Sequence, residues 1–114
     1  GTLTAAIAEA AAVAEAAGVD RAAAQEILNE GAAGSRLLKG KLLKIFKRDF
    51  VPQFQLELMD KDLRYFLSLA QVLDRPAPIA SLVRSQYQAA RRASFGKLDA
   101  CAVFLQASGE KPAG

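Results

Sequence analysis

The stretch that decides the fold is Phe50-Val51-Pro52-Gln53-Phe54-Gln55-Leu56-Glu57-Leu58-Met59-Asp60-Lys61-Asp62-Leu63. It opens with an aromatic–proline–aromatic loop, because Pro52 disfavours helical backbone at the residue before it. It continues as an amphipathic helix, which we expect from about Leu56 to Leu73. The main apolar stripe of this helix comprises Leu56, Met59, Leu63, Phe66, Leu67, Ala70 and Leu73, and a second comprises Leu58, Tyr65 and Leu69. A helix that is apolar on two sides is central in its fold or shared with a partner.

Helix signals precede this stretch. A first helix is predicted from about Thr2 to Ala17, ended by Gly18. Asp20 is the N-cap of a second helix, Arg21 to Asn29, which Gly31 stops. Its apolar anchors are Ile27 and Leu28. After the small-residue turn Gly31–Ser35, Ser35 caps a third helix through Phe46. The inward stripe of this third helix comprises Leu38, Leu42, Ile45 and Phe46.

Helix signals also follow it. Residues 74–78 form a stiff turn with two prolines. The helix from Leu56 to Leu73 is thus the fourth. A fifth helix follows the turn and runs to about Ser94, and a last short helix covers about Leu98 to Gln106. The residues of the fifth helix expected to face inward are Ile79, Leu82, Val83, Tyr87 and Ala90. No segment has a strand pattern, so the sequence predicts an all-α domain of about six helices over residues 1–107, with a disordered tail over residues 108–114.

The composition excludes several classes of function. The 114 residues include no histidine and one cysteine, Cys101, with a net charge of +3. The commonest general base, the Ser–His nucleophile, the commonest metal ligand and a thiolate metal cluster are therefore excluded. Cys101 lies between alanines, which favours a buried, inert thiol. No apolar run is long enough to span a bilayer and the start has no signal-peptide pattern, so we expect a cytoplasmic protein.

Lys61 is the first candidate for a functional side chain. It shares the polar helix face with Glu57, with which it is four residues apart in the favourable order for an ion pair. One interpretation is a solvated surface lysine. The other is a lysine at the wall of a cofactor cleft, where the ammonium faces ligand oxygen atoms. Asp62 falls on the second apolar stripe, where a structural salt bridge is favoured over catalysis.

A basic stretch is the second candidate, with the six cations Arg36, Lys39, Lys41, Lys44, Lys47 and Arg48 and no intervening acid. A phosphate or nucleic-acid surface would need such a cluster. A solvated helix face is the favoured explanation, and the stretch lacks the interleaved aromatics on which bases stack. We therefore do not expect a nucleic-acid partner. The first helix is small-residue-rich around its circumference, so it is packed on several sides or joins a partner.

Taken in order, these features resemble the C-terminal helical domain of the β-hydroxyacid dehydrogenases. The features are the Glu9–Glu15 helix with Gly18 and Asp20, the Gly31–Ser35 turn, the Asp49–Phe54 loop, and Leu58-Met59 before Lys61-Asp62-Leu63. The family includes 3-hydroxyisobutyrate dehydrogenase and tartronate semialdehyde reductase, and a similar domain occurs in 6-phosphogluconate dehydrogenase. The resemblance covers the chain to about Leu105.

The resemblance implies a function. Family members transfer hydride between a small 3-hydroxy acid and NAD or NADP, which a dinucleotide-binding domain holds. This chain has no such fingerprint, and the family's catalytic lysine lies upstream, so we assign no catalytic residue. Lys61 matches the family lysine that contacts the nicotinamide cofactor and substrate region. We expect a homodimer or larger homo-oligomer, and no turnover by the isolated chain. The alternative is a stand-alone helical dimerisation or interaction module without catalysis.

Overall fold

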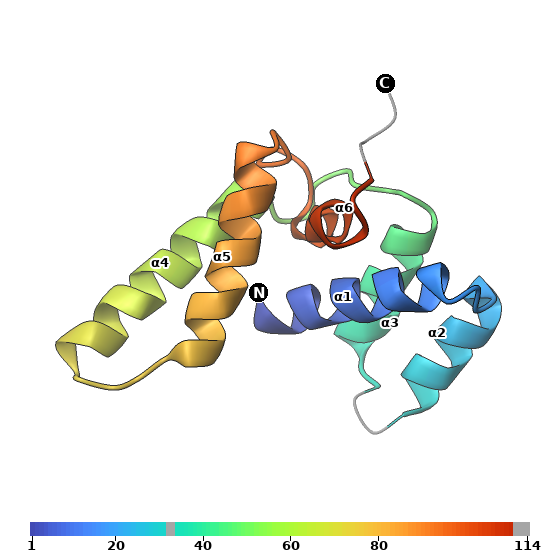
Figure 1. Ribbon diagram of the computed structural model, residues 1–114, viewed down its shortest axis with the longest axis horizontal. Coiled ribbons are helices and arrows are strands. Elements are labelled where there is room, and N and C mark those ends of the chain that lie inside the picture. Colours follow the sequence, from blue (N-terminus) through green and yellow to red (C-terminus); the bar gives the residue numbers. More distant parts are fainter. Residues whose placement is uncertain (32–33, 111–114) are drawn as a thin grey trace.

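Six α-helices and one short 3₁₀ helix form the part of the chain that the computed structural model describes, residues 1–31 and 34–110 (Figure 1). The elements are α1 (Thr2–Ala16), α2 (Arg21–Glu30), α3 (Arg36–Phe46), α4 (Leu56–Val72), α5 (Pro78–Arg92), η1 (Ala100–Ala102) and α6 (Val103–Ser108). Within these residues there is no β-strand beyond a single bridge between Gln55 and Asp99. The predicted all-α class is confirmed.

The predicted caps begin their helices as expected. The Asp20 carboxylate accepts a hydrogen bond from Ala23 N at 3.2 Å, and the Ser35 hydroxyl accepts one from Leu38 N at 3.1 Å. Each side chain satisfies one of the free N–H groups of a first helical turn. Both assignments are confirmed.

The backbone geometry requires glycine at two positions. Gly18 ends α1 with a φ of +78°, the left-handed region in which a Cβ is strained. A Cβ on Gly34 would lie 2.1 Å from the Asn29 carbonyl oxygen, so no larger residue fits there. The predicted small-residue turn also includes residues 32 and 33, which are outside the described residues.

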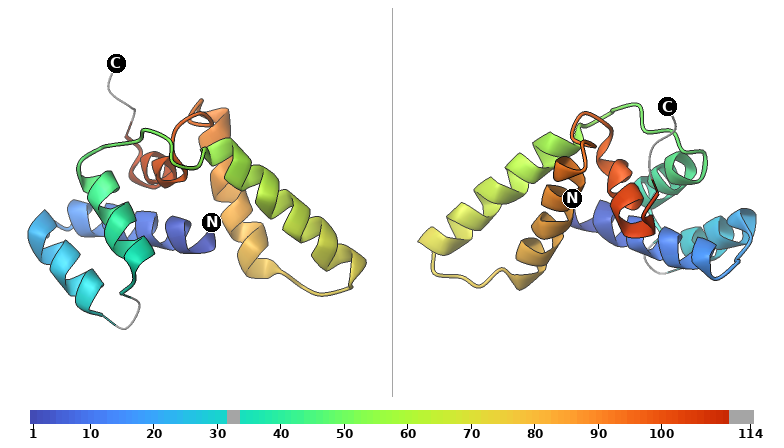
Figure 2. Two further views of the ribbon diagram at one scale, coloured as in Figure 1. Left: turned by 180° about the vertical axis from the view of Figure 1, so that it is seen from behind. Right: turned by 45° about the horizontal axis from the view of Figure 1, so that its top comes forward.

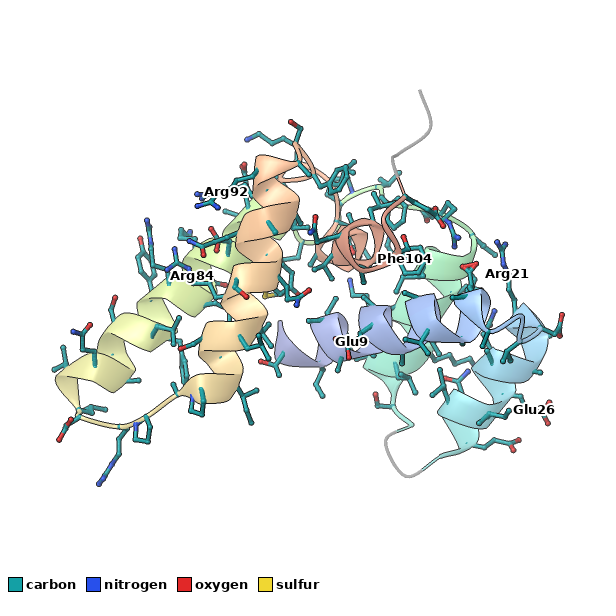
Figure 3. All side chains as sticks on the ribbon, in the orientation of Figure 1. Glu9, Arg21, Glu26, Arg84, Arg92 and Phe104 are labelled. Carbon is teal, nitrogen blue, oxygen red and sulfur yellow. The ribbon has the colours of Figure 1, made fainter. Side chains whose placement is uncertain are left out.

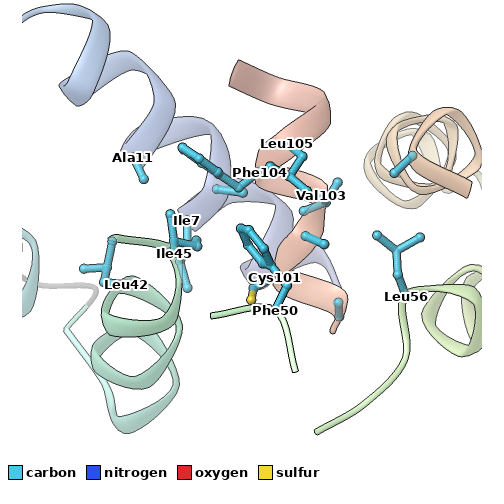
Figure 4. Close-up of a cluster of buried hydrophobic side chains, with 14 of the residues drawn as sticks. Ile7, Ala11, Leu42, Ile45, Phe50, Leu56, Cys101, Val103, Phe104 and Leu105 are labelled. Carbon is cyan, nitrogen blue, oxygen red and sulfur yellow. The ribbon is translucent and has the colours of Figure 1, made fainter. Parts of the chain in front are cut away.

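The core lies where α1, α3 and the η1–α6 segment meet (Figure 4). Its members share near-complete burial and come from distant parts of the sequence: Ile7, Ala8 and Ala11 of α1; Leu38, Leu42, Ile45 and Phe46 of α3; and Ala100 to Leu105. The alanines allow α1 to approach its neighbours closely. Together these segments exclude water from one continuous apolar cluster.

Helices α4 and α5 form an antiparallel hairpin, residues 56–92, which we call the arm. Figures 1 and 2 show it standing to one side of α2, α3 and α6. It reaches the core chiefly through Leu56, Tyr87 and Ala90. This arrangement gives a Cα radius of gyration of 14.3 Å, against about 13 Å for a compact domain of this length.

Several residues predicted to face inward are exposed. Ile79 and Leu82 of α5 are 69% and 66% exposed, and the exposures of Phe66 in α4 and of Leu73, the residue after α4, exceed 50%. The two-layer arm explains this, because its outer half has no third element to cover these side chains. Ile27 of α2 was also predicted as an anchor and is 66% exposed.

The end of the chain also differs from the expected single helix. The segment begins as the 3₁₀ turn η1 and becomes α6 at Val103. The Asp99 side chain caps this turn by accepting from Cys101 N at 3.0 Å. Ser108 closes α6, and Glu110 contacts Arg48. Residues 111–114 of the predicted tail lie outside the described residues.

Candidate functional site

Lys61 lies in the second turn of α4 with its side chain exposed. The predicted pair with Glu57 does not form, because the Glu57 carboxylate binds Lys97 at 2.6 Å. Among residues 1–31 and 34–110, no group forms a hydrogen bond or ion pair with the Lys61 ammonium. The ammonium is thus available to an external anionic or polar group.

The neighbouring Asp60 fixes how α4 is rotated against α5. Its carboxylate is 1% exposed and binds Arg84 Nε at 3.3 Å and Arg91 Nη1 at 3.0 Å. Figure 3 shows Arg84 on the arm, where the two helices face each other. Since consecutive helical residues are about 100° apart, this clamp turns Lys61 outward. The sequence analysis missed Asp60.

Asp62 has a different environment from the one predicted. It is exposed, and across the described part of the chain no ion pair involves it, so the expected salt bridge at this position is wrong. The structural carboxylate is Asp60, two residues earlier. Helical geometry turns residues 60 and 62 to nearly opposite directions, which explains why only one of them meets the arginines of α5.

The start of α1 packs against the same turn of α4. The Gly1 carbonyl accepts from Tyr87 Oη at 2.8 Å and from Ala5 N at 3.0 Å. A Cβ on Gly1 would lie 2.7 Å from Met59 Sδ, which shows how closely the two helices approach. Burial lowers the pKa of the Gly1 amino group; Lys41 lowers it further and Asp62 opposes this. These charges therefore lie around the start of α1.

A second buried carboxylate, Asp99, organises the loop before α4. It is fully buried; Oδ1 accepts from Gln53 N at 2.9 Å and Phe54 N at 3.1 Å. Oδ2 accepts from Cys101 N at 3.0 Å and from Lys41 Nζ at 3.0 Å. Burial alone would raise the pKa of Asp99, but these hydrogen bonds outweigh it and hold the pKa well below its usual range. The charged carboxylate therefore positions the loop that leads into α4.

Cys101 is buried in the core, as predicted. Burial is the main cause that raises the pKa of its thiol far above the usual value, and the nearby Asp99 charge adds to this. A thiol held neutral and away from solvent is not a nucleophile. The predicted burial of this cysteine is confirmed, and its low reactivity stays a prediction.

Three cations of the basic stretch are used inside the fold. Lys41 binds Asp99, and Lys44 lies 3.7 Å from Asp49. Arg48 binds Glu15 at 2.8 Å and Glu110 at 2.6 Å, and its guanidinium lies 4.6 Å from the centre of the Phe104 ring. Helical spacing would place these three cations in one stripe, but α3 ends at Phe46 and each of the three binds another group of the fold. A phosphate or nucleic-acid surface on this stripe loses its basis.

Neither a metal site nor a membrane-spanning helix has a candidate among the described residues. No group of three or more His, Cys, Asp or Glu side chains is placed to hold a metal ion there. In the same residues no helix has the length and apolar character needed to cross a membrane.

Comparisons with known proteins agree with the resemblance noted above. Residues 1–106 match the family described as NAD-binding of NADP-dependent 3-hydroxyisobutyrate dehydrogenase. The crystal structure of a 3-hydroxyisobutyrate dehydrogenase from Salmonella typhimurium superposes with a TM-score of 0.86 and 28% sequence identity, covering 90% of this chain and 36% of that one.

Curated relatives carry another name. The chain is 36% identical over 107 residues to the cytokine-like nuclear factor N-PAC of Aedes aegypti, covering 94% of this chain and 19% of that protein. It is 31% identical over 104 residues to N-PAC of Homo sapiens, covering 91% of this chain and 19% of that protein. The chain thus spans about one fifth of these relatives. By the family match and the structural likeness, it belongs to the 3-hydroxyisobutyrate dehydrogenase family and is an example of that family's C-terminal helical domain.

Proposed function

We propose that this chain is the helical domain of an NAD(P)-dependent β-hydroxyacid dehydrogenase and closes the cleft in which a small 3-hydroxy acid meets the cofactor. The proposal includes a cytoplasmic location and a homodimer or larger homo-oligomer. NAD or NADP would be held mainly by a dinucleotide-binding domain. The helical domain spans residues 1–107 in this proposal.

The observation that carries the proposal is the state of Lys61. Its ammonium is exposed and, among described residues, unpaired, although acidic neighbours lie on both sides of it in sequence. A lysine whose role was to stabilise the helix would bind Glu57, which instead binds Lys97. A free ammonium on a helix of fixed rotation fits the carboxamide, ribose or phosphate oxygens of a nicotinamide cofactor. We assign Lys61 to cofactor binding.

Other residues of the chain hold Lys61 in place. Asp60 clamps α4 to α5, and Asp99 fixes the loop that enters α4. Tyr87 binds the carbonyl at the start of α1, which fixes the direction of that helix beside α4. When bound, the nicotinamide accepts or donates the hydride. This chain then orients the cofactor and excludes water, and it supplies no acid or base for the reaction.

The test compares two lysine variants of the native polypeptide as it occurs in its source cells. Lys61→Ala removes the proposed cofactor contact, whereas Lys39→Ala removes an exposed lysine of α3. Loss of one charge-assisted hydrogen bond predicts a fall in kcat/KM of about tenfold or more for Lys61→Ala, mainly through KM for the cofactor. Lys39→Ala should remain within about twofold of the wild type. Equal values for the two variants would remove Lys61 from the site.

The isolated 114-residue chain should have no dehydrogenase activity, because the proposed catalytic lysine and dinucleotide fingerprint are not among its residues. Incubation with NAD or NADP and a panel of small 3-hydroxy acids, followed by absorbance of the reduced nicotinamide, tests this directly. Measurable turnover would contradict the assignment.

A stand-alone helical interaction module is the alternative function. The large apolar side chains left exposed on the arm favour it, since such surfaces mark interaction sites. Relatives named as nuclear factors also carry a domain of this kind. An intact mass close to 12.1 kDa for the polypeptide in its source cells would favour this alternative, and a far larger mass would favour the dehydrogenase.

A further inference from the structure

The buried carboxylate of Asp60 holds two arginines of α5 side by side. Its Oδ1 accepts from Arg84 Nε at 3.3 Å, and its Oδ2 lies 3.0 Å from Arg91 Nη1. A guanidinium carries several N–H donors in a planar fork, and the contact with Asp60 uses only part of them. Among residues 1–31 and 34–110, the other N–H groups of these two guanidiniums have no hydrogen-bond partner. They are therefore available to an acceptor from outside the chain.

Both guanidiniums reach solvent, although the carboxylate between them does not. The side chains of Arg84 and Arg91 are 24% and 51% exposed, and Asp60 is buried. Figure 3 shows Arg84 on the arm between α4 and α5. One arginine is enough to neutralise one carboxylate. The second adds a positive charge that no acid of the described residues pairs with.

A third arginine adds to this charge. Arg64 lies one helical turn after Asp60, so it is on the same side of α4, and it is exposed. Glu57, an acid on the neighbouring face of the helix, is bound by Lys97 at 2.6 Å and does not balance the arginines. Three cations thus surround one carboxylate, with a net charge of +2. We call the three cations the arginine cluster: Arg64, Arg84 and Arg91.

We propose that the arginine cluster binds the phosphate group of a small molecule. The guanidinium fork matches phosphate oxygens, and two guanidiniums held side by side can bind different oxygens of one phosphate. Because Asp60 fixes Arg84 and Arg91 before a ligand arrives, little side-chain freedom is lost on binding. The site is separate from the cofactor contact assigned to Lys61, which points in another direction from α4. Either assignment can therefore fail without the other.

The experiment titrates the 114-residue chain with inorganic phosphate, followed by ³¹P nuclear magnetic resonance at low ionic strength, because salt screens exposed charges. Arg84→Gln removes charge-assisted hydrogen bonds and should raise the dissociation constant at least about tenfold. Arg75→Gln is the matched control, since Arg75 is an exposed arginine in the turn between α4 and α5. It should bind phosphate within about twofold of the wild type. Equal weakening by the two variants would show a response to total charge and refute the site.

Arg84→Lys separates a positioned fork from charge alone. It keeps the positive charge but loses the planar pair of donors, so it should weaken phosphate binding nearly as much as Arg84→Gln. Circular dichroism checks that the helices remain. If the Arg84 variants unfold, Arg64→Gln tests the cluster without touching the Asp60 contacts and should weaken binding about threefold or more. A wild type that does not bind phosphate overturns the proposal, and so does an unchanged affinity in Arg84→Lys or, where that variant unfolds, in Arg64→Gln.

Competition then identifies the kind of molecule that carries the phosphate. Displacement of bound phosphate by NADP but not by NAD would assign the cluster to a phosphate monoester of the cofactor. Displacement by 3-phosphoglycerate but not by glycerate would assign it to a phosphorylated hydroxy acid. Either result supports the proposal. Bound phosphate that neither compound displaces is an adventitious ion only, and this result overturns the proposal.

Discussion

Replacement of Asp99 by asparagine tests whether one buried carboxylate holds the loop before α4. The variant has one amide oxygen in place of two carboxylate oxygens, yet four donors still face it: three backbone N–H groups and the Lys41 ammonium. The NH₂ group of asparagine donates and cannot accept, so the two donors that face it would lose their hydrogen bonds. Lys41, with a side chain only 12% exposed, would also lose its counterion.

The expected loss of stability follows from these contacts. Removing one partner of a buried ion pair costs about 3–5 kcal/mol. Partial hydration of Lys41 places Asp99→Asn at the lower end, about 3 kcal/mol, out of a total that is about 5–15 kcal/mol for most domains. With a urea m-value of about 1.5 kcal/mol per M, the unfolding midpoint should fall by about 2 M.

Urea unfolding followed by circular dichroism measures the change. The control is Asp49→Asn, because Asp49 is half exposed and lies 3.7 Å from Lys44, so its loss should cost less than about 1 kcal/mol. The pKa of Asp99 is held below its unfolded value of about 3.9, so its contribution is present above that pH and is lost as the pH falls below it. Asp99→Asn should remove this acid-dependent part. A loss no greater than that of the control would refute the reasoning.

Two further predictions concern buried groups. Tyr87→Phe removes the hydrogen bond to the Gly1 carbonyl and should cost about 1 kcal/mol in thermal unfolding. Burial raises the pKa of Tyr87, so the unfolded chain ionises first and wild-type stability should decline above about pH 10; a decline of the same steepness in Tyr87→Phe would contradict this. Cys101 should react with a thiol reagent only as fast as the protein opens, and rapid labelling of the native protein would show that the thiol is accessible.

The features best predicted from the sequence depend on near neighbours. The caps Asp20 and Ser35 bind N–H groups three residues away, and the turn at Gly18 needs a glycine for its own backbone angle. Such contacts are specified within a few residues, so pattern and propensity suffice. The family resemblance extended this local information to the whole domain.

The residues that brace the site could not be predicted in this way. Asp99 binds groups 46 and 58 residues away, and Asp60 binds an arginine 24 residues away. Asp62 was expected to form a salt bridge because it falls on an apolar stripe. The sequence does not specify which side of α4 meets the arginines of α5, and that orientation decides between Asp60 and Asp62.

Some side chains of the arm that were predicted to be buried are exposed, for a related reason. Ile79 and Leu82 have helical spacing with Tyr87, and periodicity predicts one buried stripe for all of them. Only Tyr87 reaches the core. An apolar stripe predicts that a helix face packs against something, but it does not show whether the packing partner belongs to the same chain.

The position of α6 has a consequence for protein synthesis. Val103, Phe104 and Leu105 fill the centre of the core between α1 and α3 and are at most 2% exposed (Figure 4). On the ribosome, the first three helices therefore emerge long before the residues that cover their apolar sides. The arm, whose helices are neighbours in sequence, can pair as soon as both have left the exit tunnel. Until the last helix is translated, the apolar sides of α1 and α3 therefore lack the side chains that cover them in the folded domain, and such exposed apolar surface favours aggregation.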